Sequence, residues 1–136
     1  MKVAIREIII TILLALVIFM AIRSVMHNFE VSGYSMEPNM HNGQYVIVSK
    51  ISYWFDDPQR GDVVVFDTGE NTQDIIHRVV GLPGEKVEIK NGTLHINDEI
   101  LDEPYIGQNP RSEYPGVVPP DHYFIVGDNR GGASRG

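Results

Sequence analysis

At 136 residues, the chain is long enough for one domain with a hydrophobic core and too short for two independent ones. Its formal net charge of -7, from 18 acidic and 11 basic residues, and the lack of a Lys/Arg cluster interleaved with aromatics argue against a nucleic-acid partner. The absence of cysteine excludes disulfides, thiolate metal sites and a cysteine nucleophile. The 13 Gly and 8 Pro residues favour a turn-rich, mostly β domain.

The first element is an apolar run, Ile8 to Ile22, which a single threonine interrupts. As a helix it would span only about 22 Å, against roughly 30 Å of membrane hydrocarbon. If Arg6 and Arg23 extend their charged ends to the membrane surface, residues 3–26 form a single crossing. We therefore predict a membrane anchor over residues 1–28. A cleavable secretory signal is the alternative, although no small-x-small cleavage motif follows the run.

The basic residues around this run indicate its orientation. Lys2, Arg6 and the α-amino group precede the run, whereas Arg23 alone follows it closely. Positively charged flanks are retained on the cytoplasmic side of a membrane. The bias predicts a cytoplasmic N-terminus at the cell membrane, with the rest of the chain outside.

Residues 29–136 switch to the pattern of short β-strands. The first two predicted strands, Tyr45–Val48 and Asp62–Phe66, are rich in β-branched apolar residues, and we expect both to be buried. Between them, Ile51–Phe55 concentrates aromatic side chains. These rings form either a satellite hydrophobic cluster or a patch that rests on lipid headgroups.

A third strand and a hairpin follow. Ile75–Val80 is the third predicted strand, and Val87–Lys90 and Thr93–Ile96 form the hairpin. Asn91-Gly92 supplies the two positive-φ residues of a type I′ turn. His95 falls on the face opposite the apolar residues of the hairpin, so we interpret it as a surface residue rather than a ligand.

The last part of the chain combines a loop and a strand. Asn109–Pro120 is rich in proline and is predicted to be a loop, and Tyr123–Val126 is the last evident strand. The fold class that we expect is mostly β: a single N-terminal transmembrane helix followed by an antiparallel β-sheet domain over residues 29–136.

Ser35 lies in a segment suited to exposing a hydroxyl, Val31–Met40, shortly after the apolar run. Gly33 allows backbone conformations that a Cβ forbids, and Pro38 fixes φ and ends any regular ladder. Such a turn can present the Ser35 hydroxyl as a nucleophile. An ordinary Gly/Ser/Pro loop has the same composition and is the alternative.

Four motifs, in order, resemble those of the type I signal peptidases, the membrane-bound serine proteases that remove leader peptides from exported proteins. They are Ser32-Gly33-Tyr34-Ser35-Met36-Glu37-Pro38, Arg60–Phe66, His77–Glu85 and Gly127–Arg130, and the resemblance covers nearly the whole chain. It implies a serine-lysine protease fold, a signal peptide as substrate and contact with membrane lipid. It implies neither a cofactor nor a metal ion.

In that family, the serine attacks the peptide carbonyl and a neutral lysine acts as general base. The lysine position here is His77, as in signal peptidases of the endoplasmic reticulum type and of archaea. Histidine starts from a pKa of about 6.5 and needs less desolvation than lysine. Its shorter side chain must still bring Nε2 within about 3 Å of Ser35 Oγ. A structural histidine satisfied by backbone is the alternative.

The resemblance also suggests the groups around this dyad. Asp128 is a candidate for holding the His77 tautomer, or else a turn-forming aspartate that bonds backbone amides. Some family members use a serine hydroxyl two residues before the nucleophile, where this chain has Gly33. The oxyanion hole would then depend on backbone amides, chiefly that of Ser35. We expect Gly33, Ser35 and Met36 to bind oxyanion or substrate.

The end of the chain departs from the family pattern. After Gly-Asp-Asn-Arg, the family has a serine, then Asp-Ser-Arg, and further strands, whereas Ala133 and Arg135 occupy the serine and aspartate positions here. We expect the C-terminal strands to be missing.

Two functions stay open. The first is a membrane-bound serine endopeptidase that removes signal peptides. The second is an inactive relative that binds extended leader peptides at a sheet edge without cleaving them. The membrane run disfavours a self-cleaving repressor-type protease.

Overall fold

The computed structural model describes residues 1–69 and 73–131. The chain divides into two compact units, one of Met1–Phe29 with Tyr45–Asp56 and one of Glu30–Gln44 with Asp57–Gly136. Ala133 and Arg135, where the sequence departs from the signal peptidase pattern, lie outside the described residues.

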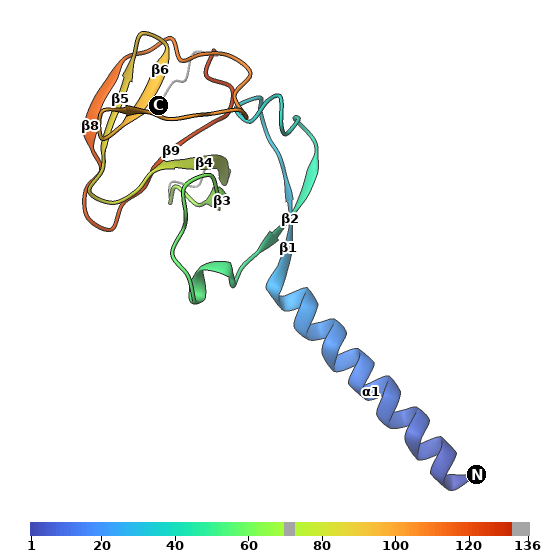
Figure 1. Cartoon of the computed structure of the whole chain (residues 1–136). Coiled ribbons are helices and arrows are strands. Elements are labelled where there is room, and N and C mark those ends of the chain that lie inside the picture. Colours follow the sequence, from blue (N-terminus) through green and yellow to red (C-terminus); the bar gives the residue numbers. More distant parts are fainter. Residues whose placement is uncertain (70–72, 132–136) are drawn as a thin grey trace. The chain divides into compact units, whose positions relative to one another are not determined.

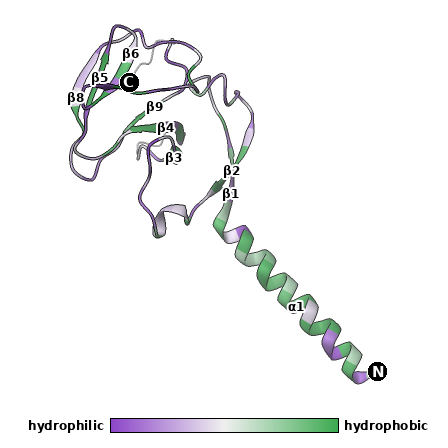
Figure 2. Cartoon of the chain, in the orientation of Figure 1, coloured by the Kyte–Doolittle hydropathy of each residue, from purple (hydrophilic) through white to green (hydrophobic). Residues whose placement is uncertain are grey.

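The first unit begins with α1, Lys2–Val25, a helix of 24 residues (Figure 1). It is about 36 Å long at 1.5 Å per residue. Hydrophobic residues predominate along its length (Figure 2), and it is long and apolar enough to cross a membrane. The helix extends beyond the apolar run Ile8–Ile22 at both ends, so it is no longer shorter than the membrane hydrocarbon.

A two-stranded ribbon continues the first unit. β1, Met26–Glu30, follows the helix directly and pairs with β2, Tyr45–Ser49. The prediction of a strand over Tyr45–Val48 is confirmed, but the prediction that it is buried is wrong: Tyr45 and Ile47 are 69% and 67% exposed. The reason is that β2 pairs in a narrow ribbon rather than inside a larger sheet, so its faces are not covered as those of a core strand are.

The aromatic segment of this unit is exposed. Ser52–Trp54 forms a short 3₁₀ helix, η1, and Trp54 and Phe55 are 73% and 84% exposed. This exposure argues against a satellite hydrophobic cluster. Contact of these rings with lipid headgroups stays a prediction.

The second unit contains two sheets whose strand pairings are antiparallel (Figure 1). One has the order β3-β4-β9, and the other has the order β7-β6-β5-β8. Their bounds are β3 Val63–Phe66, β4 Ile75–Gly81, β5 Lys86–Lys90, β6 Thr93–Ile96, β7 Glu99–Ile100, β8 Tyr114–Val117 and β9 Phe124–Val126.

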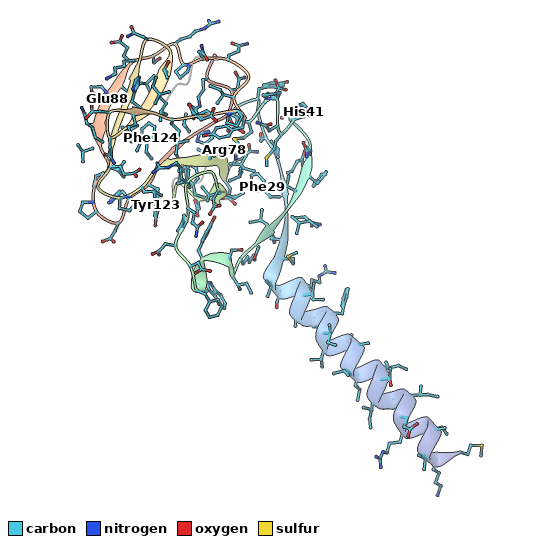
Figure 3. The ribbon with its side chains drawn as sticks, viewed as in Figure 1. Phe29, His41, Arg78, Glu88, Tyr123 and Phe124 are labelled. Atoms are coloured by element: carbon cyan, nitrogen blue, oxygen red, sulfur yellow. The ribbon has the colours of Figure 1, made fainter. Side chains whose placement is uncertain are left out.

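The core of this unit is formed by apolar side chains from both sheets. Val80 of β4 packs with residues of β5 and β6, and Phe124 of β9 lies against them (Figure 3). The buried members are Val80, Val87, Leu94, Ile96 and Val118. The mostly β fold with an N-terminal apolar helix is therefore as expected.

The hairpin of β5 and β6 is also confirmed. Its turn residues Asn91 and Gly92 have φ of 52° and 74°, as a type I′ turn requires. The expectation of a surface position for His95 is only partly correct, because this residue is half-buried and its Nδ1 has no hydrogen-bond partner in the described structure. β7 pairs with β6 alongside His95 and reduces its exposure.

The loop predicted over Asn109–Pro120 contains a strand. β8 pairs with β5, with Val117 opposite Lys86 and Tyr114 opposite Ile89. Pro115 and Gly116 lack strand propensity, which hid this strand from a pattern argument. Pro115 is tolerated because β8 lies at the edge of its sheet, where a missing N–H breaks no ladder on the outer side.

Gly81, at the end of β4, offers a test of the packing between the sheets. An added Cβ would lie 2.8 Å from Phe124 Cβ, 2.8 Å from Val87 Cγ2 and 3.2 Å from Val118 Cγ2. We expect Gly81→Ala to lower the free energy of unfolding by roughly 1–3 kcal/mol through overpacking. Urea unfolding, with the exposed Lys90→Ala as control, measures this, and an unchanged midpoint would contradict the packing described.

Candidate active site

The segment that carries Ser35 is a turn fixed by buried side chains on both sides. Val31 and Met36 are 2% and 1% exposed, whereas Ser35 itself is half-buried. Gly33 has φ of 92°, a conformation that favours glycine, and its N–H donates to Asn42 Oδ1 at 2.8 Å. The Gly33 amide is therefore occupied, and it is the Ser35 amide that has no hydrogen-bond acceptor among the described residues.

The carbonyl side of this turn docks onto the segment after β9. The backbone N–H of Asn129 donates to Ser35 O at 2.8 Å, and Asn129 Nδ2 donates to Tyr34 O at 3.1 Å. Gly127 packs so closely that an added Cβ would lie 3.0 Å from the Ser35 carbonyl carbon and 3.1 Å from Ser35 Cβ. The first and last sequence motifs thus form one structural element.

His77 lies in β4, the strand next to β9. Arg78 is opposite Val126, the last residue of β9, so His77 lies next to the end of this ladder, where Gly127 follows. The imidazole is half-buried, with its centroid 6.0 Å from that of the Phe66 ring. Gly127 therefore has Ser35 packed on it and directly follows β9, the strand that pairs with the strand of His77. In the described structure, no hydrogen bond joins Ser35 Oγ to the imidazole.

The surroundings of His77 favour its neutral form. Burial lowers the pKa of the imidazole from its ordinary value of 6.5. Two opposing charges act more weakly: the carboxylate of Asp128 raises this pKa and the guanidinium of Arg130 lowers it. A neutral imidazole at pH 7 can accept a proton, which is what a general base must do.

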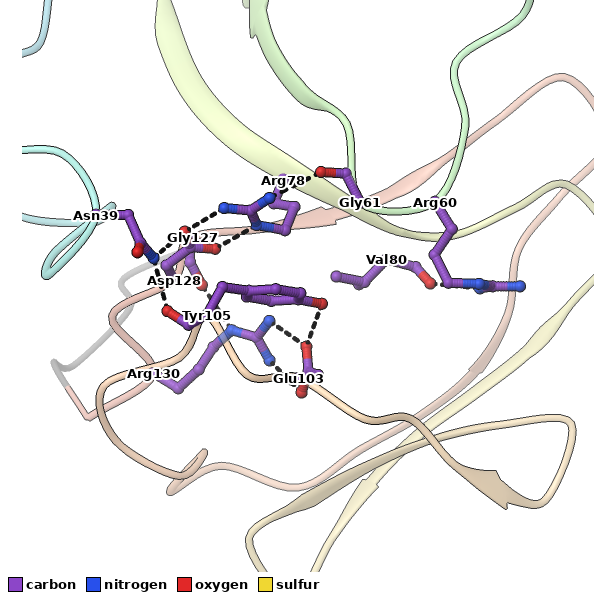
Figure 4. Close-up of polar contacts among 10 residues, drawn as sticks. All are labelled: Asn39, Arg60, Gly61, Arg78, Val80, Glu103, Tyr105, Gly127, Asp128 and Arg130. Carbon is purple, nitrogen blue, oxygen red and sulfur yellow. Dashed lines mark hydrogen bonds and ion pairs between the residues drawn. The ribbon is translucent and has the colours of Figure 1, made fainter.

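Asp128 is fully buried, and its hydrogen bonds go to neither His77 nor backbone amides. It accepts from Arg78 Nε at 2.8 Å and Nη2 at 2.7 Å, and from Asn39 Nδ2 at 2.8 Å (Figure 4). Arg78 and His77 are adjacent in β4 and point to opposite faces, so a carboxylate that is bidentate to Arg78 faces away from the imidazole. The influence of Asp128 on His77 is that of a nearby charge.

A second buried ion pair, between Arg130 and Glu103, holds the segment that follows β9. Arg130 Nη2 donates to Glu103 Oε1 at 2.6 Å and Nε donates to Gly127 O at 2.6 Å (Figure 4). The Tyr105 hydroxyl donates to Glu103 at 3.1 Å, and its ring lies 4.1 Å from the Arg78 guanidinium carbon. Burial raises the pKa of Tyr105 to about 12, so it stays a donor.

Sequence reasoning did not identify several of these residues as part of the site. Asn129 and Arg130 lie in the Gly-Asp-Asn-Arg motif, which was the available signal for them. Asn39, Glu103 and Tyr105 lie in segments without any pattern that marks a partner. Their roles depend on which chain segments meet in space.

Met36 was expected to take part in oxyanion or substrate binding. Its side chain is buried, so any part that Met36 takes in binding involves its backbone. Within residues 1–69 and 73–131, no group of three or more His, Asp and Glu side chains could hold a metal ion.

The second and third motifs are also joined. Arg60 donates to both carboxylate oxygens of Glu85, at 2.8 and 2.6 Å, and to Val80 O at 2.6 Å. Glu85 in turn accepts from the Leu82 N–H at 2.8 Å. All four motifs are thus linked within the second unit. The family model for signal peptidases, peptidase S26, matches residues 5–134 of this chain.

The chain belongs to the peptidase S26 family. It is 43% identical over 103 residues to the probable signal peptidase I-2 of Synechocystis sp., and 35% identical over 131 residues to signal peptidase I of Bacillus licheniformis. It is also 35% identical over 153 aligned positions to signal peptidase IB of Staphylococcus aureus. The resemblance that the motifs indicated is confirmed.

These matches cover different shares of each protein. They take in 71%, 88% and 96% of this chain, and the chain spans 47%, 70% and 78% of the three relatives. Among solved structures, a signal peptidase I from Enterococcus faecalis is 32% identical, with a TM-score of 0.48 over 56% of this chain and 80% of that one.

Proposed function

We propose that this chain is a membrane-anchored serine endopeptidase that removes signal peptides from exported preproteins. The names of its S26 relatives support the substrate class, and the length and apolar character of α1 support an anchor. Lys2 and Arg6 at the start of α1 support a cytoplasmic N-terminus. The single observation that carries the proposal is the packing of Ser35 on Gly127, which directly follows β9, the strand that pairs with the strand of His77.

The proposed reaction follows from these groups. Ser35 Oγ attacks the scissile carbonyl while neutral His77 takes its proton, and the free Ser35 N–H faces the oxyanion. His77 then protonates the leaving amine, and a water molecule activated by the same imidazole hydrolyses the acyl-enzyme. The signal peptide binds as an extended segment, with small residues at the cleavage site as the family resemblance implies.

One observation favours the alternative of a relative that binds leader peptides without cleaving them. This is the missing hydrogen bond between Ser35 Oγ and His77 in the described structure. Such bonds are often long in unliganded enzymes and shorten when substrate is bound. Turnover therefore decides between the two functions.

We expect cleavage of a fluorogenic leader peptide in detergent to rise with pH and reach a plateau near neutrality, with a midpoint below 6.5. The reason is that only the neutral imidazole can accept the Ser35 proton and burial lowers the pKa of His77, so activity is lost as the pH falls through this pKa. Rates measured from pH 5 to 9 give the midpoint.

Two variants serve as controls for this profile. Ser35→Ala should abolish turnover at every pH. His77→Gln should abolish most of the activity and also the acid limb, which is the rise in activity between pH 5 and neutrality. A midpoint well above 7 would contradict His77 as the base. Binding of the peptide with no turnover by the unmodified chain would support the non-cleaving alternative.

A further inference from the structure

We propose that Asn129 is a positioning residue that directs the Ser35 N–H toward the oxyanion of the reacting peptide. The inference rests on the proposed function, and it assigns a task to the hydrogen bond between Asn129 Nδ2 and Tyr34 O. Asn129 would act through the backbone of the nucleophile turn without touching substrate.

The argument starts from the geometry of one peptide group. Tyr34 O and the Ser35 N–H belong to the same planar trans peptide, so they point in opposite directions. The Tyr34 oxygen accepts from Asn129 Nδ2 at 3.1 Å and from the Glu37 N–H of its own turn at 3.3 Å, so Asn129 supplies the shorter of the two bonds that set the direction of the Ser35 N–H. The next peptide is held in the same way, because the Asn129 N–H bonds Ser35 O at 2.8 Å and so orients the Met36 N–H.

Asn129 is itself held rigidly enough to set a direction. Its neighbours Asp128 and Arg130 are buried and paired with Arg78 and Glu103. Its backbone also forms a parallel bridge with Gln108. A donor fixed on both sides costs little reorganisation when charge develops on the oxyanion.

Of the groups near Ser35 that could donate a hydrogen bond to the oxyanion, Gly33 can be set aside. The Gly33 N–H is already bonded to Asn42 Oδ1 at 2.8 Å, and Gly33 has no side-chain hydroxyl to offer. The Ser35 N–H has no acceptor among the described residues. The direction of that single N–H therefore matters more than it would in a site with a side-chain donor.

The test compares Asn129→Leu with the unmodified full-length chain in detergent. Leucine branches at Cγ as asparagine does and is also uncharged, but it is larger and cannot donate a hydrogen bond; the backbone bond to Ser35 O is retained. Asn129→Ala is the second variant, in case leucine disturbs the fold. Asn109→Leu is the matched control, because this exposed asparagine lies beside the Gly92 turn. Thermal unfolding establishes that each variant is folded.

Three quantities are measured for each chain: kcat and KM for a leader peptide, affinity for a peptide aldehyde, and affinity for an uncleavable peptide of the same sequence. The aldehyde adds the Ser35 O–H across its C=O to form a hemiacetal, and its oxygen occupies the oxyanion position. We expect Asn129→Leu to lower kcat and aldehyde affinity by about 10- to 100-fold, with KM and uncleavable-peptide affinity within threefold.

The outcomes separate the inference from the proposed function. Equal weakening of aldehyde and uncleavable peptide would indicate a purely structural role and overturn the inference. So would an unchanged kcat in both Asn129 variants of an active enzyme. An unmodified chain that neither cleaves the peptide nor binds the aldehyde would overturn the proposed function, and the inference with it.

Discussion

Replacing Gly127 by alanine is expected to reduce kcat/KM for a leader peptide by about 100-fold or more. The added Cβ would collide with the Ser35 carbonyl oxygen and lie 3.0 Å from the carbonyl carbon. These are backbone atoms, so the clash cannot be relieved by a side-chain rotation, and the Ser35 turn must shift. A displacement of about 1 Å in a reacting group can reduce the rate by about 100-fold.

The control for this variant is Val126→Ala, one residue earlier. Val126 lies opposite Arg78 and packs against the core, so its truncation removes apolar contacts without pushing on Ser35. We expect Val126→Ala to lower the unfolding temperature and to retain kcat. Activity of Gly127→Ala within threefold of the unmodified chain would show that Ser35 does not depend on this packing.

The second large effect is expected on stability. Asp128→Asn should lower the free energy of unfolding by about 3 kcal/mol, because it leaves the charge of Arg78 without its buried counter-ion. The side chains of Arg78 and Asp128 are 14% and 0% exposed. Arg78 would retain its bond to Gly61 O at 2.8 Å, which does not compensate the charge.

Denaturant unfolding of a double-mutant cycle measures this coupling. The double variant Arg78→Met, Asp128→Asn should lose less stability than the sum of the two single variants, since no buried charge is left unpaired. The matched control is Asp98→Asn, which breaks an exposed pair with Lys86 and should leave the transition unchanged. Additive single effects would argue against a coupled buried pair.

The Asp128 variant also tests the electrostatic link to His77. The carboxylate of Asp128 raises the pKa of His77, so its removal should move the acid limb of the cleavage profile to lower pH. A direct hydrogen bond from Asp128 to the imidazole would instead predict a large loss of kcat at every pH, as expected when a tautomer is no longer held.

Several features of this protein could be predicted from the sequence because they depend on neighbours in the chain. The apolar run yields α1, Asn91-Gly92 yields the β5–β6 turn, and the four motifs identify the S26 family. Helix formation, turn conformation and side-chain alternation depend on residues a few positions apart. Ser35 and His77 were found in the same way, from motifs that a single segment contains.

The arrangement around those two residues was decided only by tertiary structure. The exposure of β2, the strand β8 and the pairing of Asp128 with Arg78 and Asn39 depend on which segments meet and in which register. A strand presents opposite faces at successive residues, so the neighbouring positions His77 and Arg78 face different partners once β4 is placed between β3 and β9. The sequence by itself determined the family and the candidate dyad. Long-range packing decided that Gly127 and Asn129 hold the Ser35 turn, because contacts between residues some 90 positions apart leave no local pattern.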